Sequence, residues 1–354
     1  MTGNRDGEGA GNAADLAEPL LAGEHAALAR AITAIENRDP GYRDLVSTLH
    51  PHAGSAAIVG VTGSPGAGKS TLVDRLVGAC RDRGETVGVL AIDPASPFSG
   101  GAVLGDRIRM GSHAGDMDAF VRSMSARGTL GGLSAATADA ITALDAFGMD
   151  RIVVETVGAG QNEIDVVRTA DTVCVLLQPE SGDAVQTLKA GILEIADVLV
   201  VNKADLDGAD RLVSDLREMV EEGEEAGSHR IAEENAVTGG HRVAEGASDA
   251  SWTPPIVETV ATEGTGVPSL VSAIDDHGAF LDRSGLRAEK ARTRHAEAIR
   301  TLLRDDLREL VEREVESRGG FDDLVDAVYR REKDPYGVVA DLLAPIEDCL
   351  DDDG

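Results

Sequence analysis

Residues 63–71 read GSPGAGKST, and this stretch decides the fold. It matches the pattern G-x-x-x-x-G-K-[ST] and stands between an apolar, strand-like run (AAIVGV) and a stretch of helical periodicity. Glycines allow backbone N–H groups to approach phosphates, and the N-terminus of a helix adds the positive end of its dipole. We expect Lys69 to neutralise phosphate oxygens and the Ser70 hydroxyl to ligate Mg²⁺. The predicted phosphate-binding residues are Gly63, Ser64, Pro65, Gly66, Ala67, Gly68, Lys69, Ser70 and Thr71.

Further apolar runs follow this P-loop at regular intervals. They are rich in β-branched residues, and helical stretches long enough for crossovers lie between them. Strands connected in this way are parallel and are buried on both faces. The sequence therefore predicts an α/β P-loop NTPase fold, with a mostly parallel sheet and helices on both faces. The predicted strands are residues 56–61, 86–92, 151–155, 172–177, 198–201 and 255–260.

A helical extension precedes the predicted nucleotide-binding domain. Residues 1–14 are rich in glycine and polar residues, so we expect a disordered N-terminus. Residues 15–54 place Leu28, Ile32 and Ile35 on one helical face before a Pro-Gly break. This pattern predicts helices that pack through one apolar stripe.

The nucleotide-binding domain is predicted for residues 55–282, with an acidic surface excursion at about 208–252. Residues 283–354 show helical periodicity only, interrupted at Gly319-Gly320. The apolar stripe of this tail either packs on the chain's own sheet or is buried in a second subunit. We favour a C-terminal helical dimerisation arm, because the nucleotide-binding domain looks complete without it.

The chain is strongly acidic, since 63 Asp and Glu residues against 33 Lys and Arg give a formal net charge of −30. Such a charge repels nucleic acids and anionic membranes, so we expect no nucleic acid and no membrane as partner. Adaptation of a halophilic protein to a high-salt cytoplasm accounts for the acidic surplus. The 3 cysteines match no disulfide framework or CxxC metal pair, and no apolar run approaches the roughly 20 residues of a membrane span. We expect a cytoplasmic protein.

The tetrapeptide Asn202-Lys203-Ala204-Asp205 ends the predicted strand at residues 198–201. The Asp205 carboxylate can accept two hydrogen bonds from the N1–H and the 2-amino group of guanine, and adenine lacks this pair of donors. The tetrapeptide, placed after a P-loop and two strands, predicts binding of GTP or GDP through Asn202, Lys203 and Asp205.

Two acidic residues lie after the second predicted strand. Asp93 ends the run VLAID at the edge where open α/β sheets bind ligands, and Asp106 follows in a Gly- and Ser-rich loop. Either carboxylate can serve Mg²⁺ directly or through water, and either can instead stabilise a turn or cap a helix. Arg107 and Arg109 in the same loop can act on the phosphates or form structural ion pairs.

The stretch ETVGAGQ carries Glu155 where an acid that binds the Mg²⁺–nucleotide complex is expected. Its carboxylate can reach Mg²⁺ through water or act as general base for the attacking water. We expect the Gly158 N–H to meet the γ-phosphate and Gln161 to orient the water.

Six blocks occur in the order and at the spacing of a known family: GSPGAGKST, DPASPFSGGAVLGDRIRM, SARGTLGG, ETVGAGQNEIDV, QPESGDAVQTLKAGILEIAD and NKAD. They resemble the MeaB/ArgK family, which contains GTPases associated with methylmalonyl-CoA mutase. The resemblance covers roughly residues 28–281, and DPYGVVADLL near the C-terminus is similar to the family's tail.

This resemblance implies a GTPase of the signal-recognition and MinD class that forms a homodimer through its C-terminal arm. It further implies a chaperone of methylmalonyl-CoA mutase or a related cobalamin-dependent mutase, which couples GTP hydrolysis to cofactor loading, protection and reactivation. The adenosylcobalamin belongs to the partner mutase. The implied site residues are Lys69 and Ser70 for phosphate and Mg²⁺, Asp93, Asp106 and Glu155 for an acidic metal shell, and Asp183, Gln186, Lys189 and Glu194 for a third switch.

One motif departs from the family pattern. The family usually has Ser-Ala before x-x-G-x-G, whereas this chain has Val260-Ala261. The guanine contact in the family comes from the backbone N–H at the position of Ala261, so Val260 leaves it possible.

Two alternative functions remain. An ArgK-like kinase or ATPase of amino-acid transport is disfavoured by the guanine motif. A metallochaperone GTPase needs thiolate or imidazole ligands, and the 8 histidines form no cluster with the cysteines in the sequence.

Overall fold

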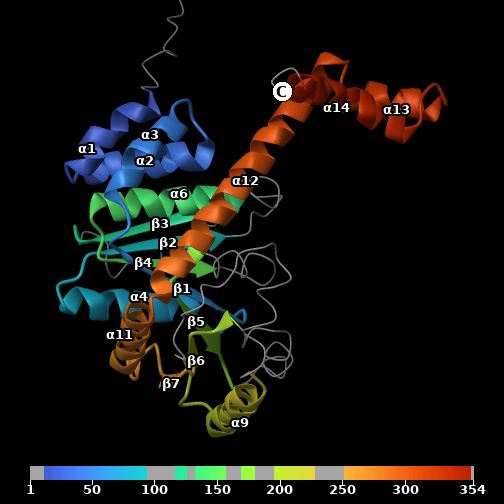
Figure 1. Cartoon of the computed structure of the whole chain (residues 1–354). Coiled ribbons are helices and arrows are strands. Elements are labelled where there is room, and N and C mark those ends of the chain that lie inside the picture. Colours follow the sequence, from blue (N-terminus) through green and yellow to red (C-terminus); the bar gives the residue numbers. More distant parts are fainter. Residues whose placement is uncertain are drawn as a thin grey trace, which may run out of the picture. The chain divides into compact units, whose positions relative to one another are not determined.

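The computed structural model describes residues 12–93, 116–125, 132–156, 169–179, 195–227 and 251–351. Its main feature is a seven-stranded sheet in the order β3-β2-β4-β1-β5-β6-β7, in which all neighbouring strands are parallel (Figure 1). The predicted parallel α/β sheet is therefore confirmed. The strands are β1 (Ala57–Gly63), β2 (Val87–Asp93), β3 (Ala119–Ser125), β4 (Arg151–Thr156), β5 (Thr172–Leu177), β6 (Val198–Asn202) and β7 (Ile256–Thr259).

Helices cover both faces of the sheet because its strands are apolar on both sides. In β5, Val173 and Val175 belong to one hydrophobic cluster, whereas Cys174 and Leu176 belong to the other. The first cluster includes side chains of α6 (Gly132–Phe147) and α9 (Ala209–Gly227). The second includes side chains of α4 (Lys69–Asp82) and α11 (Val267–Ser284). Alternate strand residues thus pack on opposite helical layers.

The N-terminal extension is helical and packs on α6 (Figure 1). The predicted apolar face is confirmed, since Leu28, Ile32 and Ile35 are all buried. Between this extension and β1, the chain is held by the buried Asp145 carboxylate of α6. This carboxylate accepts hydrogen bonds from the backbone N–H groups of Gly54, Ser55 and Ala56 at 2.6, 3.1 and 3.1 Å. The elements are η1 (Ala13–Leu16), α1 (Ala17–Leu21), α2 (His25–Asn37), α3 (Tyr42–Leu49) and η2 (His50–His52).

Among the strands that the structure describes, the edge strand β3 is the one that the sequence did not predict. It pairs with β2 along its whole length, with Ala119 opposite Val87 and Ser125 opposite Asp93. The sequence AFVRSMS lacks a continuous apolar run because this edge strand is only partly covered: Phe120 packs against one hydrophobic cluster and Val121 against the other, and both are half-buried. Met124 is its one buried side chain among residues 119–124.

The first turns of α12 (Leu286–Ser317) are bound to the sheet through the buried Asp171, which precedes β5. Its carboxylate accepts a hydrogen bond from the Ile58 N–H at 3.1 Å and forms ion pairs with Arg287 at 3.3 Å and with Arg294. The Lys290 ammonium donates to the Asp171 carbonyl at 2.7 Å. Asp171 therefore links the beginning of β1 to the first turns of α12.

A buried histidine lies at the same amino-terminal edge of the sheet. His277 Nδ1 lies 2.8 Å from the Thr172 hydroxyl, and its Nε2 lies 3.2 Å from the Asp197 carboxylate. Burial lowers the pKa of His277 from 6.5 to about 4, against the opposing effect of the Asp197 charge. His277 is therefore neutral at pH 7.

The chain divides into two compact units, Met1–Arg294 and His295–Gly354. The second unit contains the rest of α12, α13 (Phe321–Tyr329) and α14 (Pro335–Asp351), and the predicted interruption at Gly319-Gly320 is confirmed. Many large apolar side chains of this unit are exposed. They are Ile299, Leu302, Leu303, Leu307, Leu310, Phe321, Val325, Tyr329, Tyr336, Val339 and Leu343.

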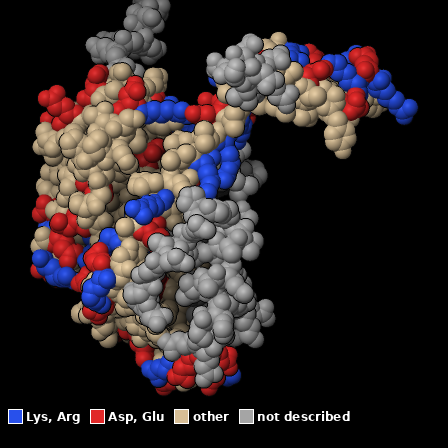
Figure 2. Space-filling model, viewed as in Figure 1, with Lys and Arg blue, Asp and Glu red and all other residues tan. Residues whose placement is uncertain are grey.

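Acidic side chains are spread over the visible face and do not gather in one patch, and Lys and Arg lie between them (Figure 2). Among the helices that the structure describes, none is long and apolar enough to cross a membrane.

Candidate nucleotide-binding site

The P-loop connects the end of the central strand β1 to the start of α4. Gly63, Gly66 and Gly68 have φ angles of +137, +79 and +90°, a region that favours glycine. A Cβ atom on Gly63 would lie 2.1 Å from the Leu176 carbonyl oxygen, and one on Gly68 would lie 2.5 Å from Asn202 Nδ2. The loop therefore requires glycine at both positions, for backbone conformation and for space.

The helix after the loop forms because Leu72, Val73, Leu76 and Val77 recur at helical spacing and are buried against the sheet. This packing brings Lys69 and Ser70 of the first turn to the carboxyl end of β1. Parallel strands of an open α/β sheet bind ligands at this end, beside a point where the strand order reverses. β1, with β4 on one side and β5 on the other, is such a point.

Lys69 is buried and its ammonium group is directed to the loop itself. Nζ donates hydrogen bonds to the carbonyl oxygens of Gly63, at 2.5 Å, and Ser64, at 3.2 Å. These contacts place a positive charge inside the loop, where phosphate oxygens are expected.

Ser70 and Glu155 meet at the same edge of the sheet. The Ser70 hydroxyl donates a hydrogen bond to Glu155 Oε1 at 2.7 Å, and Glu155 lies on β4 opposite Val61 of β1. A hydroxyl and a carboxylate oxygen are ligands of the kind that Mg²⁺ prefers, so the donor set fits this ion. The pairing also explains how glutamate reaches the P-loop helix from β4.

Asn202, at the end of β6, connects three segments of the site. Its side-chain amide donates to the Ala67 carbonyl at 2.7 Å, and its Oδ1 accepts from the Thr259 hydroxyl at 3.0 Å and from the Ala261 N–H at 3.1 Å. All four residues are buried. One side chain thus fixes the P-loop relative to the segment after β7.

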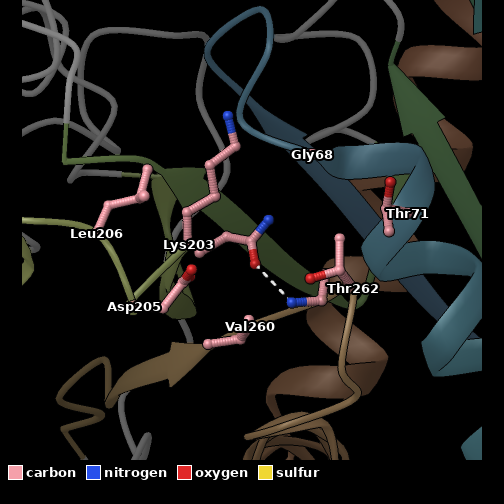
Figure 3. Close-up of a pocket in the computed structure, with 9 residues that line it drawn as sticks. Gly68, Thr71, Lys203, Asp205, Leu206, Val260 and Thr262 are labelled. Atoms are coloured by element: carbon pink, nitrogen blue, oxygen red, sulfur yellow. Dashed lines mark hydrogen bonds between the residues drawn. The ribbon is translucent and has the colours of Figure 1, made fainter.

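A pocket of about 230 Å³ lies between these segments (Figure 3). Asp205 lines it, and the binding of a base by its carboxylate stays a prediction. Lys203 has a φ angle of +60° and donates from Nζ to Gln178 Oε1 at 2.7 Å. The Ala261 N–H donates to Asn202, as the dashed line in Figure 3 shows. The lining residues are Gly68, Thr71, Asn202, Lys203, Asp205, Leu206, Val260, Ala261 and Thr262.

Sequence reasoning missed several residues of this site. Arg75 of α4 donates from Nε to the Ala261 carbonyl at 3.2 Å and from Nη2 to the Thr262 carbonyl at 2.7 Å. Thr259 and Gln178 support Asn202 and Lys203. The helical spacing of Thr71 and Arg75, four residues apart, was a usable signal for Arg75.

The other predicted site residues are not placed by the structure. Asp93 ends β2, but its side chain is outside the described part, as are Asp106, Gly158, Gln161 and Lys189. The remaining predicted switch residues Asp183, Gln186 and Glu194 also lie outside it. Among the side chains that are described, no group of three or more His, Cys, Asp or Glu residues is arranged to hold a metal ion.

The comparisons with known proteins agree with this geometry. The model of the family described as methylmalonyl-CoA mutase-associated GTPase MeaB matches residues 28–316. A protein of Pyrococcus horikoshii named as a GTPase is 46% identical over 93% of this chain and 96% of its own length. The GTPase ArgK of Escherichia coli is 33% identical over 84% of this chain and 86% of its own length.

A mouse relative, named methylmalonic aciduria type A homolog, is 31% identical over 82% of this chain and 69% of its own length. Among solved structures, a LAO/AO transport system kinase matches with a TM-score of 0.63 and 25% identity, over 97% of this chain and 100% of that one. The family implies binding of nucleotide and Mg²⁺. The chain therefore belongs to the MeaB family of methylmalonyl-CoA mutase-associated P-loop GTPases.

Proposed function

We propose that GTP binds with its phosphates on the P-loop and its guanine in the pocket beside Asp205. The observation that carries this proposal is that Gly68 and Thr71 line the same pocket as Asp205 and Ala261. The phosphate site and the base site are therefore contiguous, as one nucleotide requires. The Asp205 carboxylate accepts from the N1–H and 2-amino groups of guanine, which distinguishes guanine from adenine.

In the proposed reaction a water molecule attacks the γ-phosphate in line. The Lys69 ammonium exchanges its loop carbonyls for phosphate oxygens, and the N–H groups of the loop stabilise the developing charge. Ser70 and Glu155 would hold Mg²⁺, which would supply further charge neutralisation. Asp93, Asp106, Gly158, Gln161 and Lys189 stay predicted contributors.

Calorimetry in molar KCl tests the nucleotide site. We expect wild-type protein to bind GDP at least about 100-fold more tightly than ADP, because a site built to pair with substrate donors rejects an analogue that lacks them. Equal affinity for GDP and ADP would contradict the guanine site. It would favour the alternative suggested by the solved relative named as a kinase.

We further propose that the GTPase cycle serves an adenosylcobalamin-dependent mutase, as chaperone for cofactor loading, protection and reactivation. The family description and the name of the mouse relative support this role. Lys69→Ala removes the P-loop charge, so it should abolish nucleotide-dependent protection of methylmalonyl-CoA mutase during turnover. Arg83→Ala is a control, because Arg83 forms ion pairs with Glu85 and Asp275 outside the pocket lining. Full protection by Lys69→Ala would contradict the proposal.

A homodimer formed through the C-terminal arm is the third part of the proposal. The exposed apolar side chains of α12 and α13 support it, because a face of this kind is stabilised when a second copy covers it. Leu303→Glu on this face should shift the mass measured by light scattering from dimer to monomer, whereas Arg304→Ala on the same helix should not. A monomeric wild-type chain would refute this part.

A further inference from the structure

Arg75 links the helix of the P-loop to the loop that forms the far wall of the pocket. It lies four residues after Thr71 on α4, so both side chains are on the same face of the helix, and Thr71 lines the pocket. Its guanidinium donates one hydrogen bond to the Ala261 carbonyl at 3.2 Å and another to the Thr262 carbonyl at 2.7 Å. Both acceptors belong to pocket-lining residues.

These two contacts fix the direction of the peptide groups in the turn after β7. A trans peptide is planar and its N–H points opposite to its C=O, so holding the Ala261 carbonyl also orients the Thr262 N–H. Neighbouring amides are bound within the turn: the Val260 N–H donates to Thr265 at 3.0 Å and the Glu263 N–H to Val260 at 3.0 Å. The Ala261 carbonyl also accepts from the Gly264 N–H at 3.3 Å, so Arg75 and Gly264 together orient the Thr262 N–H at the wall of the pocket.

The turn needs such support because its own sequence is permissive. Gly264 and Gly266 have φ angles of +79 and +78°, and glycine allows many other conformations. Asn202 holds the turn from the side of β6 through the Ala261 N–H, and Arg75 holds it from the side of α4. The guanidinium binds neutral carbonyls, so salt screening, which weakens exposed ion pairs, has less effect on this contact.

We propose that Arg75 is a positioning residue that determines guanine specificity, by holding residues 261–262 in the orientation that the base requires. The inference rests on the proposed nucleotide site. It goes beyond it by assigning base selection in part to a side chain of the P-loop helix, which the P-loop and NKAD motifs do not include.

The test compares wild-type protein with Arg75→Ala, Arg75→Lys and Arg83→Ala, using the full chain in molar KCl. Calorimetry gives Kd values for GDP and ADP, and thermal unfolding without nucleotide reports stability. We expect Arg75→Ala to weaken the binding of GDP about tenfold and the binding of ADP less than about twofold. The tenfold change for GDP is the size expected for the loss of one to two hydrogen bonds in the turn after β7. Arg75→Lys, which keeps one donor group, should recover part of the loss. Arg83→Ala, at the residue that follows the same helix, should change neither Kd.

The outcomes separate this inference from the nucleotide site itself. Wild-type protein without preference for GDP would overturn both. If wild-type protein prefers GDP to ADP and Arg75→Ala retains this preference in full, only the role of Arg75 is overturned. Equal weakening of GDP and ADP would also overturn it, because the effect would then lie in the phosphate site. Since Arg75 is exposed on α4, we expect its replacement to leave the protein folded, with only the small drop in unfolding temperature that the loss of two hydrogen bonds causes.

Discussion

Replacement of Asn202 by alanine should damage both the fold and the nucleotide site. The change removes three hydrogen bonds and leaves the Ala67 carbonyl, the Thr259 hydroxyl and the Ala261 N–H without their partner. Each of these groups belongs to a buried residue. A buried polar group that loses its partner costs roughly 1–3 kcal/mol, so we expect the free energy of unfolding to fall by about 4 kcal/mol. This is a large part of the roughly 5–15 kcal/mol that stabilises a typical domain.

Guanidinium unfolding with and without GDP separates the two effects. At a GDP concentration of about 100 times Kd, the free energy of unfolding of wild-type protein should rise by about 2.7 kcal/mol. That of Asn202→Ala should rise much less, because Asn202 no longer holds the P-loop to the turn after β7. Asn202→Asp is the matched variant, since it has the same shape and keeps an acceptor for Thr259 and Ala261. It turns the donor toward Ala67 into a carboxylate oxygen, so it should lose mainly the P-loop contact and most of the gain from GDP. A loss below about 1 kcal/mol for Asn202→Ala, together with an unchanged gain from GDP, would refute this reasoning.

Two more predictions concern the P-loop and the buried histidine. Gly63→Ala should lower the free energy of unfolding by at least about 3 kcal/mol, because its Cβ would lie 2.1 Å from the Leu176 carbonyl oxygen. Gly84→Ala is the control in chemical unfolding. Gly84 also has a positive φ angle, +80°, but a Cβ there would have nothing within 4 Å, so a loss equal to that of Gly63→Ala would show that contact with β5 is irrelevant. The folded-state pKa of His277, about 4, lies below the unfolded value of 6.5, so the unfolded state binds more protons between these pH values. Stability should therefore rise with pH across this window, by up to about 3 kcal/mol, and His277→Gln should flatten the slope measured by unfolding at pH 4.5–7; an unchanged slope would contradict this assignment.

The sequence predicted the elements whose residues are buried on both faces. β1, β4, β5 and β6 are such strands, and each was predicted within two residues of its ends. The P-loop and the placement of Asp205 were predictable because their chemistry requires fixed residue types at fixed spacing. β3 was missed because a half-covered edge strand does not need an apolar run.

Contacts between distant residues could not be predicted in the same way. Arg75 meets the turn after β7 only because α4 and α11 pack on the same face of the sheet. The role of Asn202 as a connector of three segments also depends on strand order, since β6 is separated from β1 by β5. A motif identifies a residue and its ligand, but the packing of helices on the sheet determines which backbone carbonyls lie within its reach.

The ion pairs of Asp171 determine where this chain can be shortened. A protein that ended at residue 285 would retain the Asp171 carboxylate but lack Arg287, Lys290 and Arg294, leaving a buried negative charge with the Ile58 N–H as a remaining partner. A protein that ended at Arg294, where the first compact unit also ends, would keep all three cations. The first two turns of α12 therefore stabilise the nucleotide-binding domain, although the sequence predicted them as part of the C-terminal arm.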